Sequence, residues 1–347
     1  MAELDEGIQD WAELEQMLRA RWPLSSADAD LAERRDVARR VADTLAAATA
    51  LPPTDACRIR EIEVDASAPA DAPRAPFARV YEPADHDGPL PTQLFLHGGG
   101  FVFGSARELI NDSVLAARTA ATGIRHVSLA YSLAPEHPFP TARDQAVRVF
   151  DELHERAEEL GIDPERLGLG GNSAGASIIA SAALALERRA AAHGSGESSA
   201  AREGGTAGGT PPRPHHLFLE VPAVSLNALH ELAAGADDTV SSAIEAEYAK
   251  LIEQYRPALD GSAFVADAED LPPFPPTLIL AAEHDPLRSG ASLLAARLRE
   301  LGTPVREHVV PGTQHASAGI TRTSPAARRW QQIIVEDLAD AYETGAR

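Results

Sequence analysis

The feature that most constrains this chain is a serine placed between two glycines. Residues 171–175 read Gly-Asn-Ser-Ala-Gly and directly follow the strand-like run 166–169. The residues after Ser173 are almost wholly small or apolar as far as Leu186, which is typical of a helix buried against a sheet. A serine hydroxyl is a weak nucleophile, so it must project from a sharp strand-to-helix turn where a base can reach it. The segment therefore predicts a nucleophile elbow with Ser173 at its apex.

A second glycine-rich segment offers what such a nucleophile requires. Residues 97–100 read His-Gly-Gly-Gly and follow the apolar run 94–96. Attack on an acyl carbon creates an oxyanion, which backbone N–H groups can bind where no side chain obstructs them. We expect the N–H groups of Gly98, Gly99 and Ala174 to form this oxyanion hole. His97 is expected to hold the loop in shape, because the general base should come far later in the chain.

The base and its orienting acid follow from their order along the chain. After such a serine come an acid and then a histidine, each on a loop at the carboxyl end of a strand. A buried-strand run over 276–282 ends just before Asp285, and His315 follows the next strand-like run. Of the 12 histidines, His315 alone combines this order with this position. We therefore predict a triad of Ser173, Asp285 and His315, with Glu283 as an alternative orienting acid.

Four motifs in this order resemble those of the hormone-sensitive-lipase-like branch of the α/β-hydrolase esterases. They are HGGGFVFG at 97–104, YSLAPEHPFP at 131–140, GNSAG at 171–175, and DPL at 285–287 together with His315. The resemblance implies an α/β-hydrolase fold, with a mostly parallel central sheet flanked by helices and a helical cap. It also implies a serine esterase that cleaves small carboxylic esters with no metal and no cofactor.

Two departures from the family pattern concern charge. The family usually has aspartate before the nucleophile and arginine after the tyrosine of the second motif, whereas this chain has Asn172 and Ser132. If those two groups pair in relatives, their joint loss leaves no orphan charge, and catalysis can persist. A third departure removes an aromatic residue near the pocket, because Ala316 and Ser317 replace the usual Gly-Phe after the histidine.

Composition limits the classes of partner. The 347 residues are 44% hydrophobic, which suits a large core, and 52 acidic against 31 basic side chains give a net charge of −21. This charge repels nucleic acid and anionic membranes, so a small-molecule ester is the expected partner. There is no apolar run of about 18 residues and no signal-peptide pattern at the start, which predicts a cytoplasmic protein. The single cysteine, Cys57, excludes an internal disulfide. The chain could be a monomer or a homodimer.

Periodic apolar residues indicate the domain organisation. Amphipathic patterns over 3–20 and 27–48 predict two helices in an N-terminal cap segment, 1–50, before an α/β-hydrolase core over 51–347. We expect strands near 58–64, 77–83, 92–97, 125–131, 166–170, 216–221, 276–282 and 305–310. A second cap segment is expected near 225–265.

The stretch near 190–214 is rich in Ala, Gly, Ser and Pro. This composition predicts a flexible insertion. A closing helix should begin at Ser324 and Pro325.

The motifs predict acyl transfer in two steps, with water releasing the acyl group from the serine, and the cap predicts a preference for short acyl chains. The same triad could also serve an acyltransferase, an amidase or a lactonase. A non-catalytic small-molecule receptor is a further alternative, although a receptor does not need the triad residues together.

Overall fold

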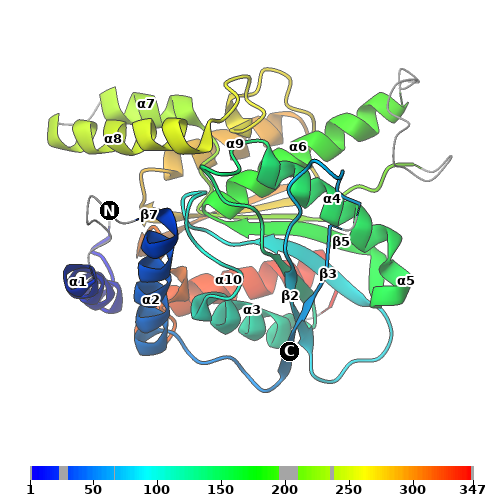
Figure 1. The fold of residues 1–347 in the computed structure, drawn as a ribbon, viewed down its shortest axis with the longest axis horizontal. Helices are drawn as coiled ribbons and strands as arrows, with labels where there is room; N and C mark the ends of the chain where they lie inside the picture. Colours follow the sequence, from blue (N-terminus) through cyan, green and yellow to red (C-terminus); the bar gives the residue numbers. More distant parts are fainter. Residues whose placement is uncertain (1, 23–29, 66, 195–209, 235–237, 345–347) are drawn as a thin grey trace.

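A twisted sheet of eight strands forms the centre of the molecule (Figure 1). The computed structural model describes residues 2–22, 30–65, 67–194, 210–234 and 238–344. The strands are β1 (Cys57–Ile62), β2 (Ala78–Pro83), β3 (Leu90–Leu96), β4 (Arg125–Leu129), β5 (Ile162–Asn172), β6 (Leu217–Glu220), β7 (Thr277–His284) and β8 (Val305–Gln314). Their order in the sheet is β1-β2-β4-β3-β5-β6-β7-β8. The β1–β2 and β2–β4 pairs are antiparallel and the other five pairs are parallel, which confirms the predicted α/β-hydrolase fold.

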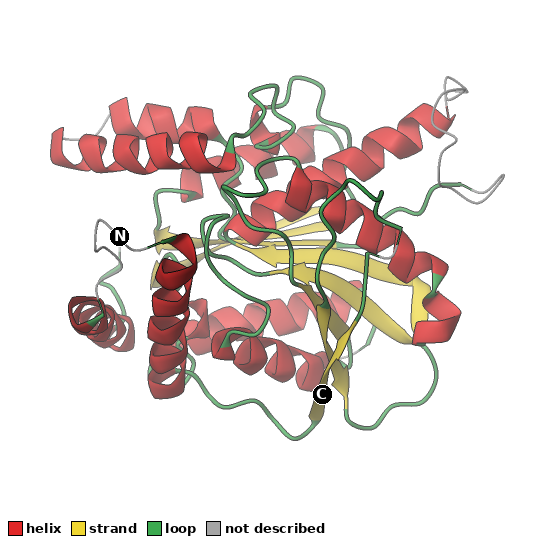
Figure 2. Cartoon of the chain, viewed as in Figure 1, coloured by secondary structure: helices red, strands yellow, loops and turns green. Residues whose placement is uncertain are grey.

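Helices cover both faces of the sheet (Figure 2). One face is covered by α3 (Leu109–Thr122) and α10 (Pro325–Ala341), and the other by α4 (Thr141–Glu155), α6 (Ala174–Gly194) and α9 (Arg288–Glu300). The short helices α5 (Ala157–Leu160), η1 (Val265–Asp267) and η2 (Ser317–Gly319) lie in connections. Each face has its own apolar cluster, one containing Phe150, Ile178 and Leu294 and the other Leu115 and Trp330. The sheet is thus buried on both sides, as parallel sheets usually are.

Four further helices lie at the end of the molecule toward which the parallel strands point (Figures 1 and 2). They are α1 (Glu6–Arg21) and α2 (Leu31–Thr49) from the start of the chain, and α7 (Leu226–Ala234) and α8 (Asp238–Tyr255) from the connection between β6 and β7. An aspartate side chain caps the start of both α1 and α2. Asp5 accepts from the N–H of Gly7, and Asp30 accepts from the N–H of Glu33. None of the helices within the described ranges combines the length and the apolar character needed to cross a bilayer.

The stretch predicted as a flexible insertion, 190–214, is helical at its start, because α6 continues to Gly194. Residues 195–209 of that stretch lie outside the described residues. The closing helix α10 begins as predicted, with the Ser324 side chain accepting from the N–H of Ala327 and Pro325 in the first turn.

The register of the parallel strands brings distant motifs to one edge of the sheet. Leu96, which precedes the glycine-rich loop, pairs with Gly171 at the end of β5. On the other side Asn172 pairs with Glu220, the last residue of β6. Farther along the sheet, His284 pairs with Gln314. The residues that follow these pairs therefore emerge together at the carboxyl ends of the strands, where ligands bind in open α/β sheets.

Candidate active site

Ser173 lies in a strained turn between the end of β5 and the start of α6. Its φ of 52° falls in the left-handed region, which non-glycine residues adopt at a cost of about 1 kcal/mol or more. The N–H of Ser173 donates to the carbonyl of Glu220 over 2.7 Å, which fixes the turn against β6. A Cβ atom at Gly175 would lie 2.1 Å from the carbonyl oxygen of Leu96, so α6 approaches β3 too closely for any side chain there. Gly175, the second glycine of the predicted elbow, is therefore required by the packing.

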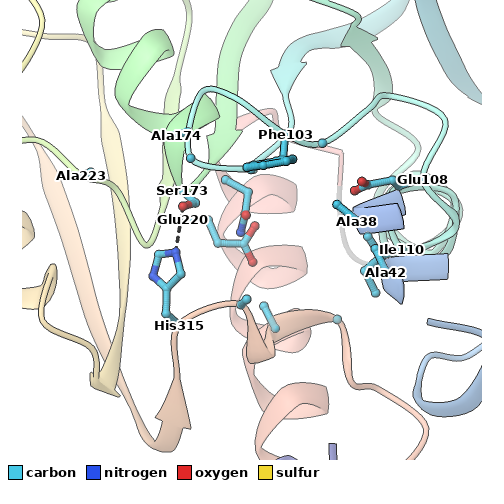
Figure 3. A pocket seen from close by; sticks show the side chains of 18 of the residues that line it. Ala38, Ala42, Phe103, Glu108, Ile110, Ser173, Ala174, Glu220, Ala223 and His315 are labelled. Carbon is cyan, nitrogen blue, oxygen red and sulfur yellow. Dashed lines mark hydrogen bonds between the residues drawn. The ribbon is translucent and has the colours of Figure 1, made fainter. Parts of the chain in front are cut away.

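The three predicted triad residues form one chain of hydrogen bonds. Ser173 Oγ lies 2.8 Å from His315 Nε2 (Figure 3), and His315 Nδ1 lies 2.7 Å from Asp285 Oδ2. The Asp285 side chain is almost fully buried, and its Oδ1 accepts from the N–H of Leu287. An imidazole that donates Nδ1–H to this carboxylate leaves Nε2 as the acceptor for the serine hydroxyl.

The alternative orienting acid, Glu283, is engaged elsewhere. Its two carboxylate oxygens accept hydrogen bonds from the N–H groups of Ala2 and Gly312, both at 2.9 Å. These bonds lower its pKa below the ordinary value. The acid that contacts His315 is Asp285.

The residues predicted to form the oxyanion hole surround Ser173. A Cβ atom at Gly98 would lie 3.2 Å from Ser173 Cβ, so the glycine-rich loop passes directly over the elbow. Gly99 has a φ of 129° and has no room for a side chain, since a Cβ atom there would lie 2.1 Å from the carbonyl oxygen of Phe103. Ala174 begins α6, whose first N–H groups have no acceptor within the helix. All three line the same pocket as Ser173 and His315.

His97 shapes this loop. It is buried, its Nδ1 lies 2.7 Å from the carbonyl oxygen of Gly98, and its ring stacks on Tyr131 at 4.5 Å. The hydroxyl of Tyr131 donates to the His97 carbonyl at 2.9 Å, so the second motif supports the first. Burial lowers the pKa of His97 to about 4, which keeps the imidazole neutral near pH 7.

The pocket is a cavity of about 1060 Å³ beside Ser173 and His315 (Figure 3). Its walls come from the helices beyond the sheet as well as from the core. The contributing side chains of those helices are Trp11, Glu15 and Arg19 of α1, Arg34, Ala38, Val41, Ala42, Leu45, Ala46 and Thr49 of α2, Leu226 and Leu229 of α7, and Lys250, Leu251 and Gln254 of α8. Substrate contacts can therefore come from both of the segments that were predicted to form a cap.

A buried ion pair lies at the pocket and was not predicted. Arg118 Nη2 lies 3.1 Å from both carboxylate oxygens of Glu220, and Trp330 Nε1 donates to the same carboxylate at 2.7 Å. Both members of the pair are about 2% exposed, and both line the cavity. The sequence holds one signal of it, because Glu220 is an acidic residue within the otherwise apolar run 217–224.

Asn172 and Ser132, which replace the aspartate and the arginine usual in the family, have different surroundings. Ser132 is held by Gln145, which accepts from the Ser132 N–H at 2.8 Å and donates to its hydroxyl at 2.8 Å. Asn172 lines the pocket, and its Oδ1 would lie 2.7 Å from a Cβ atom at Gly98. No hydrogen bond joins Asn172 to Ser132 in the described part of the chain, so no direct contact takes the place of the missing charge pair. In the same part of the chain, no group of three or more His, Cys, Asp or Glu residues could hold a metal ion.

Comparison with known proteins places this geometry in context. A model of the alpha/beta hydrolase fold family matches residues 93–318, more than half of the chain. The carboxylesterase NlhH of Mycobacterium tuberculosis is 30% identical over 279 residues, which cover 78% of each protein. The ethyl acetate hydrolase of Pseudomonas putida is 30% identical over 250 residues, which cover 68% of this chain and 70% of that protein. The crystal structure of EstE1, a thermostable carboxylesterase from a metagenomic library, is 25% identical, with a TM-score of 0.71 over 92% of this chain and 99% of its own.

Proposed function

The chain belongs to the alpha/beta hydrolase fold family, in its hormone-sensitive-lipase-like esterase branch, and on that premise we propose that it is a serine carboxylesterase acting on short-acyl esters. The observation that carries this proposal is the chain of hydrogen bonds from Ser173 through His315 to Asp285 at the wall of the cavity. The arrangement supplies a nucleophile, a base within 2.8 Å of it and a buried acid that orients the base.

In the first half of the reaction, Ser173 Oγ attacks the ester carbonyl carbon while His315 Nε2 takes the hydroxyl proton. Asp285 holds the imidazole in the required tautomer and stabilises its charged form. The N–H groups of Gly98, Gly99 and Ala174 stabilise the oxyanion of the tetrahedral intermediate, and each such donor is worth about 3 kcal/mol of barrier. The intermediate then expels the alcohol, which takes the proton from His315, and leaves an acyl group on the serine.

In the second half, His315 takes a proton from a water molecule that attacks the acyl-enzyme. The carboxylic acid leaves, and Ser173 regains its proton. An acyltransferase, an amidase or a lactonase would use the same steps with a different acceptor or leaving group. Hydrolysis of esters is preferred here because the similar proteins at 30% identity are named a carboxylesterase and an ethyl acetate hydrolase.

Two observations support a short acyl chain. Ethyl acetate, which names the hydrolase from Pseudomonas putida, carries a two-carbon acyl group. In this chain the ion pair of Arg118 and Glu220 lines the cavity, so a long alkyl chain that extended past it would lie against charged groups. The 1060 Å³ cavity nevertheless leaves room for a larger group on the alcohol side of the ester.

The proposal is tested with nitrophenyl esters of graded acyl length and with a phosphonate that forms a covalent bond to activated serines. We expect kcat/KM to be highest for acetyl and butyryl esters, an initial burst of nitrophenol from acyl-enzyme formation, and phosphonate attached to Ser173 in the digested protein. The Ser173→Ala variant is the control and should take up no phosphonate. Faster cleavage of long-chain than of short-chain esters would contradict the proposed preference for short acyl chains. Attachment of the phosphonate to another residue would contradict the assignment of Ser173 as the nucleophile.

A further inference from the structure

The cavity contains a carboxylate whose charge nothing in the described part of the chain offsets by direct contact. Three glutamates line the cavity among the described residues: Glu15, Glu108 and Glu220. Glu15 pairs with Arg19 at 2.6 Å, and Glu220 is held by its ion pair and by an indole N–H. The Glu108 carboxylate has no hydrogen bond and no ion pair with any described residue. It is therefore the carboxylate that remains available to a ligand.

Glu108 lies at the N-cap position of α3, where a side chain usually accepts hydrogen bonds from the start of the helix. It forms no such cap, and the N–H of Leu109, the first residue of the helix, donates instead to Asp43 of α2 at 2.9 Å. Figure 3 shows the Glu108 carboxylate directed into the same space as Ser173, beside Ala38, Ala42 and Ile110. Small and apolar neighbours leave this carboxylate partly desolvated and unpaired.

The charged groups around the Glu108 carboxylate favour the binding of a cation beside it. Burial and then the charge of Asp43 raise the pKa of Glu108 to about 7, and Arg39 acts in the opposite direction. Tyr131, which follows β4, lies within electrostatic reach of the same carboxylate. Arg34, a further cation of α2 at the cavity, lies over an aromatic ring and forms no ion pair with Glu108. A ligand cation placed beside Glu108 would stabilise its ionised form and replace the solvation lost by burial.

We propose that Glu108 is a specificity-determining residue that favours esters carrying an ammonium group, held in the part of the cavity between α2 and α3. This inference rests on the proposed esterase function. The cavity volume of about 1060 Å³ accommodates an ester of this kind with the carbonyl at Ser173 and the cation at the Glu108 wall. The carboxylate contributes attraction and orientation, while bond cleavage depends on the triad.

The test compares two acetates of the same shape, acetylcholine and the neutral 3,3-dimethylbutyl acetate, at pH 8. We expect kcat/KM for the cationic ester to exceed that for its neutral isostere by about tenfold or more, because a charge pair in a partly desolvated site is worth that much. Glu108→Gln, which keeps the shape and removes the charge, should abolish most of this ratio, with the loss falling mainly on the cationic ester. The ratio should also rise with pH through about 7 as Glu108 ionises. Any titration of the triad affects both esters alike and cancels in the ratio.

Glu15→Gln is the matched control, because Glu15 also lines the cavity but already has Arg19 as a partner. It should leave the ratio within about twofold of the wild-type value. Equal rates for the two esters in the wild type would overturn the inference, as would an equal loss for both esters in Glu108→Gln. Failure of the wild type to cleave nitrophenyl acetate would instead count against the esterase proposal itself, so the two failures are distinguishable.

Discussion

At Ser173 a strained backbone conformation accompanies a hydroxyl group placed for catalysis. The φ of 52° is unfavourable for serine, yet in this conformation the hydroxyl lies 2.8 Å from His315 Nε2. The turn is held by the hydrogen bond from its N–H to Glu220 and by the close approach of β3 at Gly175. Local strain at this residue is thus maintained by tertiary contacts, as expected where geometry serves chemistry.

The first prediction concerns the triad as a unit. Ser173→Ala and His315→Ala should each lower kcat by about 10⁴ to 10⁶, and the double variant should lose little more, because each single change already removes nucleophilic attack. Asp285→Asn should cost on the order of 10⁴, since an amide at this position favours the wrong imidazole tautomer. Steady-state kinetics measures the losses, and circular dichroism checks that the variants remain folded. A folded Ser173→Ala protein that retained most of its activity would contradict the mechanism.

A second prediction at this scale concerns the buried ion pair. Glu220→Gln should destabilise the protein by about 3–5 kcal/mol, because it leaves the Arg118 guanidinium buried without its anionic partner. Adding Arg118→Met should recover part of this loss, since the pair is then replaced by uncharged groups. Urea denaturation measures both. Additive losses in the double variant would show that the two residues do not stabilise each other.

At the scale of elements, the strands were predictable because they are short apolar runs separated by turn residues. All eight predicted strands are present, and most of their boundaries lie within two residues of the predicted ones, but two differ by four residues. β5 begins at Ile162 rather than at 166, because polar residues hide the pairing of Leu90 with Ile162. β8 continues to Gln314 rather than ending at 310, because its pairing with β7 resumes beyond a Pro-Gly pair that alone indicates a turn. The spacing of apolar residues and the turn-forming residues indicate only the local preference for strand or turn, whereas the end of a strand depends on its pairing with the neighbouring strand.

The parts of the candidate site that lie in contiguous sequence motifs could be predicted, and the contacts between distant residues could not. The motifs around Ser173 and Gly98 are contiguous in the sequence, and chain order placed Asp285 and His315. The surroundings of Glu108 and Glu220 depend on residues far away in the chain. Nothing near Glu108 in the sequence indicates that Asp43 accepts from the first N–H of α3, and nothing near Glu220 indicates Arg118, 102 residues earlier. Such pairings appear only when the elements are packed.

The packing of α6 on β3 leads to the third prediction. Gly175→Ala should destabilise the fold by about 1–3 kcal/mol and lower kcat, because the new methyl group would press against the carbonyl oxygens of Leu96 and His97 and push the elbow away from the glycine-rich loop. Gly290→Ala in α9 is the control, since the nearest atom to its new methyl group would be Ser225 Cβ at 3.2 Å. Thermal midpoints and kcat should fall together in the first variant and change little in the second. Unchanged kcat in Gly175→Ala would show that this contact does not position Ser173.

At the scale of the whole molecule, chain segments far apart in sequence enclose one cavity. The glycine-rich loop and the strand ends of the core supply the candidate catalytic groups, while α1 and α2 from the start of the chain and α7 and α8 from its second half supply walls. Changes in the walls can therefore alter specificity without moving the triad. Glu108 illustrates this separation, because it lies at a wall of the cavity and takes no part in the hydrogen bonds that join Ser173, His315 and Asp285.

The last prediction concerns the response of the whole fold to acid. His97 and His126 are both buried, and burial lowers their pKa values to about 4 and about 3, respectively. In the unfolded chain both should titrate near the ordinary value of about 6.5, so below that pH the unfolded state binds protons that the folded state excludes. Between pH 7 and pH 5 the two histidines should therefore lower the free energy of unfolding by on the order of 4 kcal/mol. Glu108 acts in the opposite direction, because its raised pKa of about 7 lets the folded state bind a proton that the unfolded state does not, and it should offset about 2 kcal/mol of that loss. His126→Gln, which cannot take up a proton, should remove about half of the histidine contribution. Urea denaturation at pH 8, 7, 6 and 5 measures it independently of activity, and a free energy of unfolding that stayed level from pH 7 to pH 5 would mean that these histidines do not remain neutral in the folded protein.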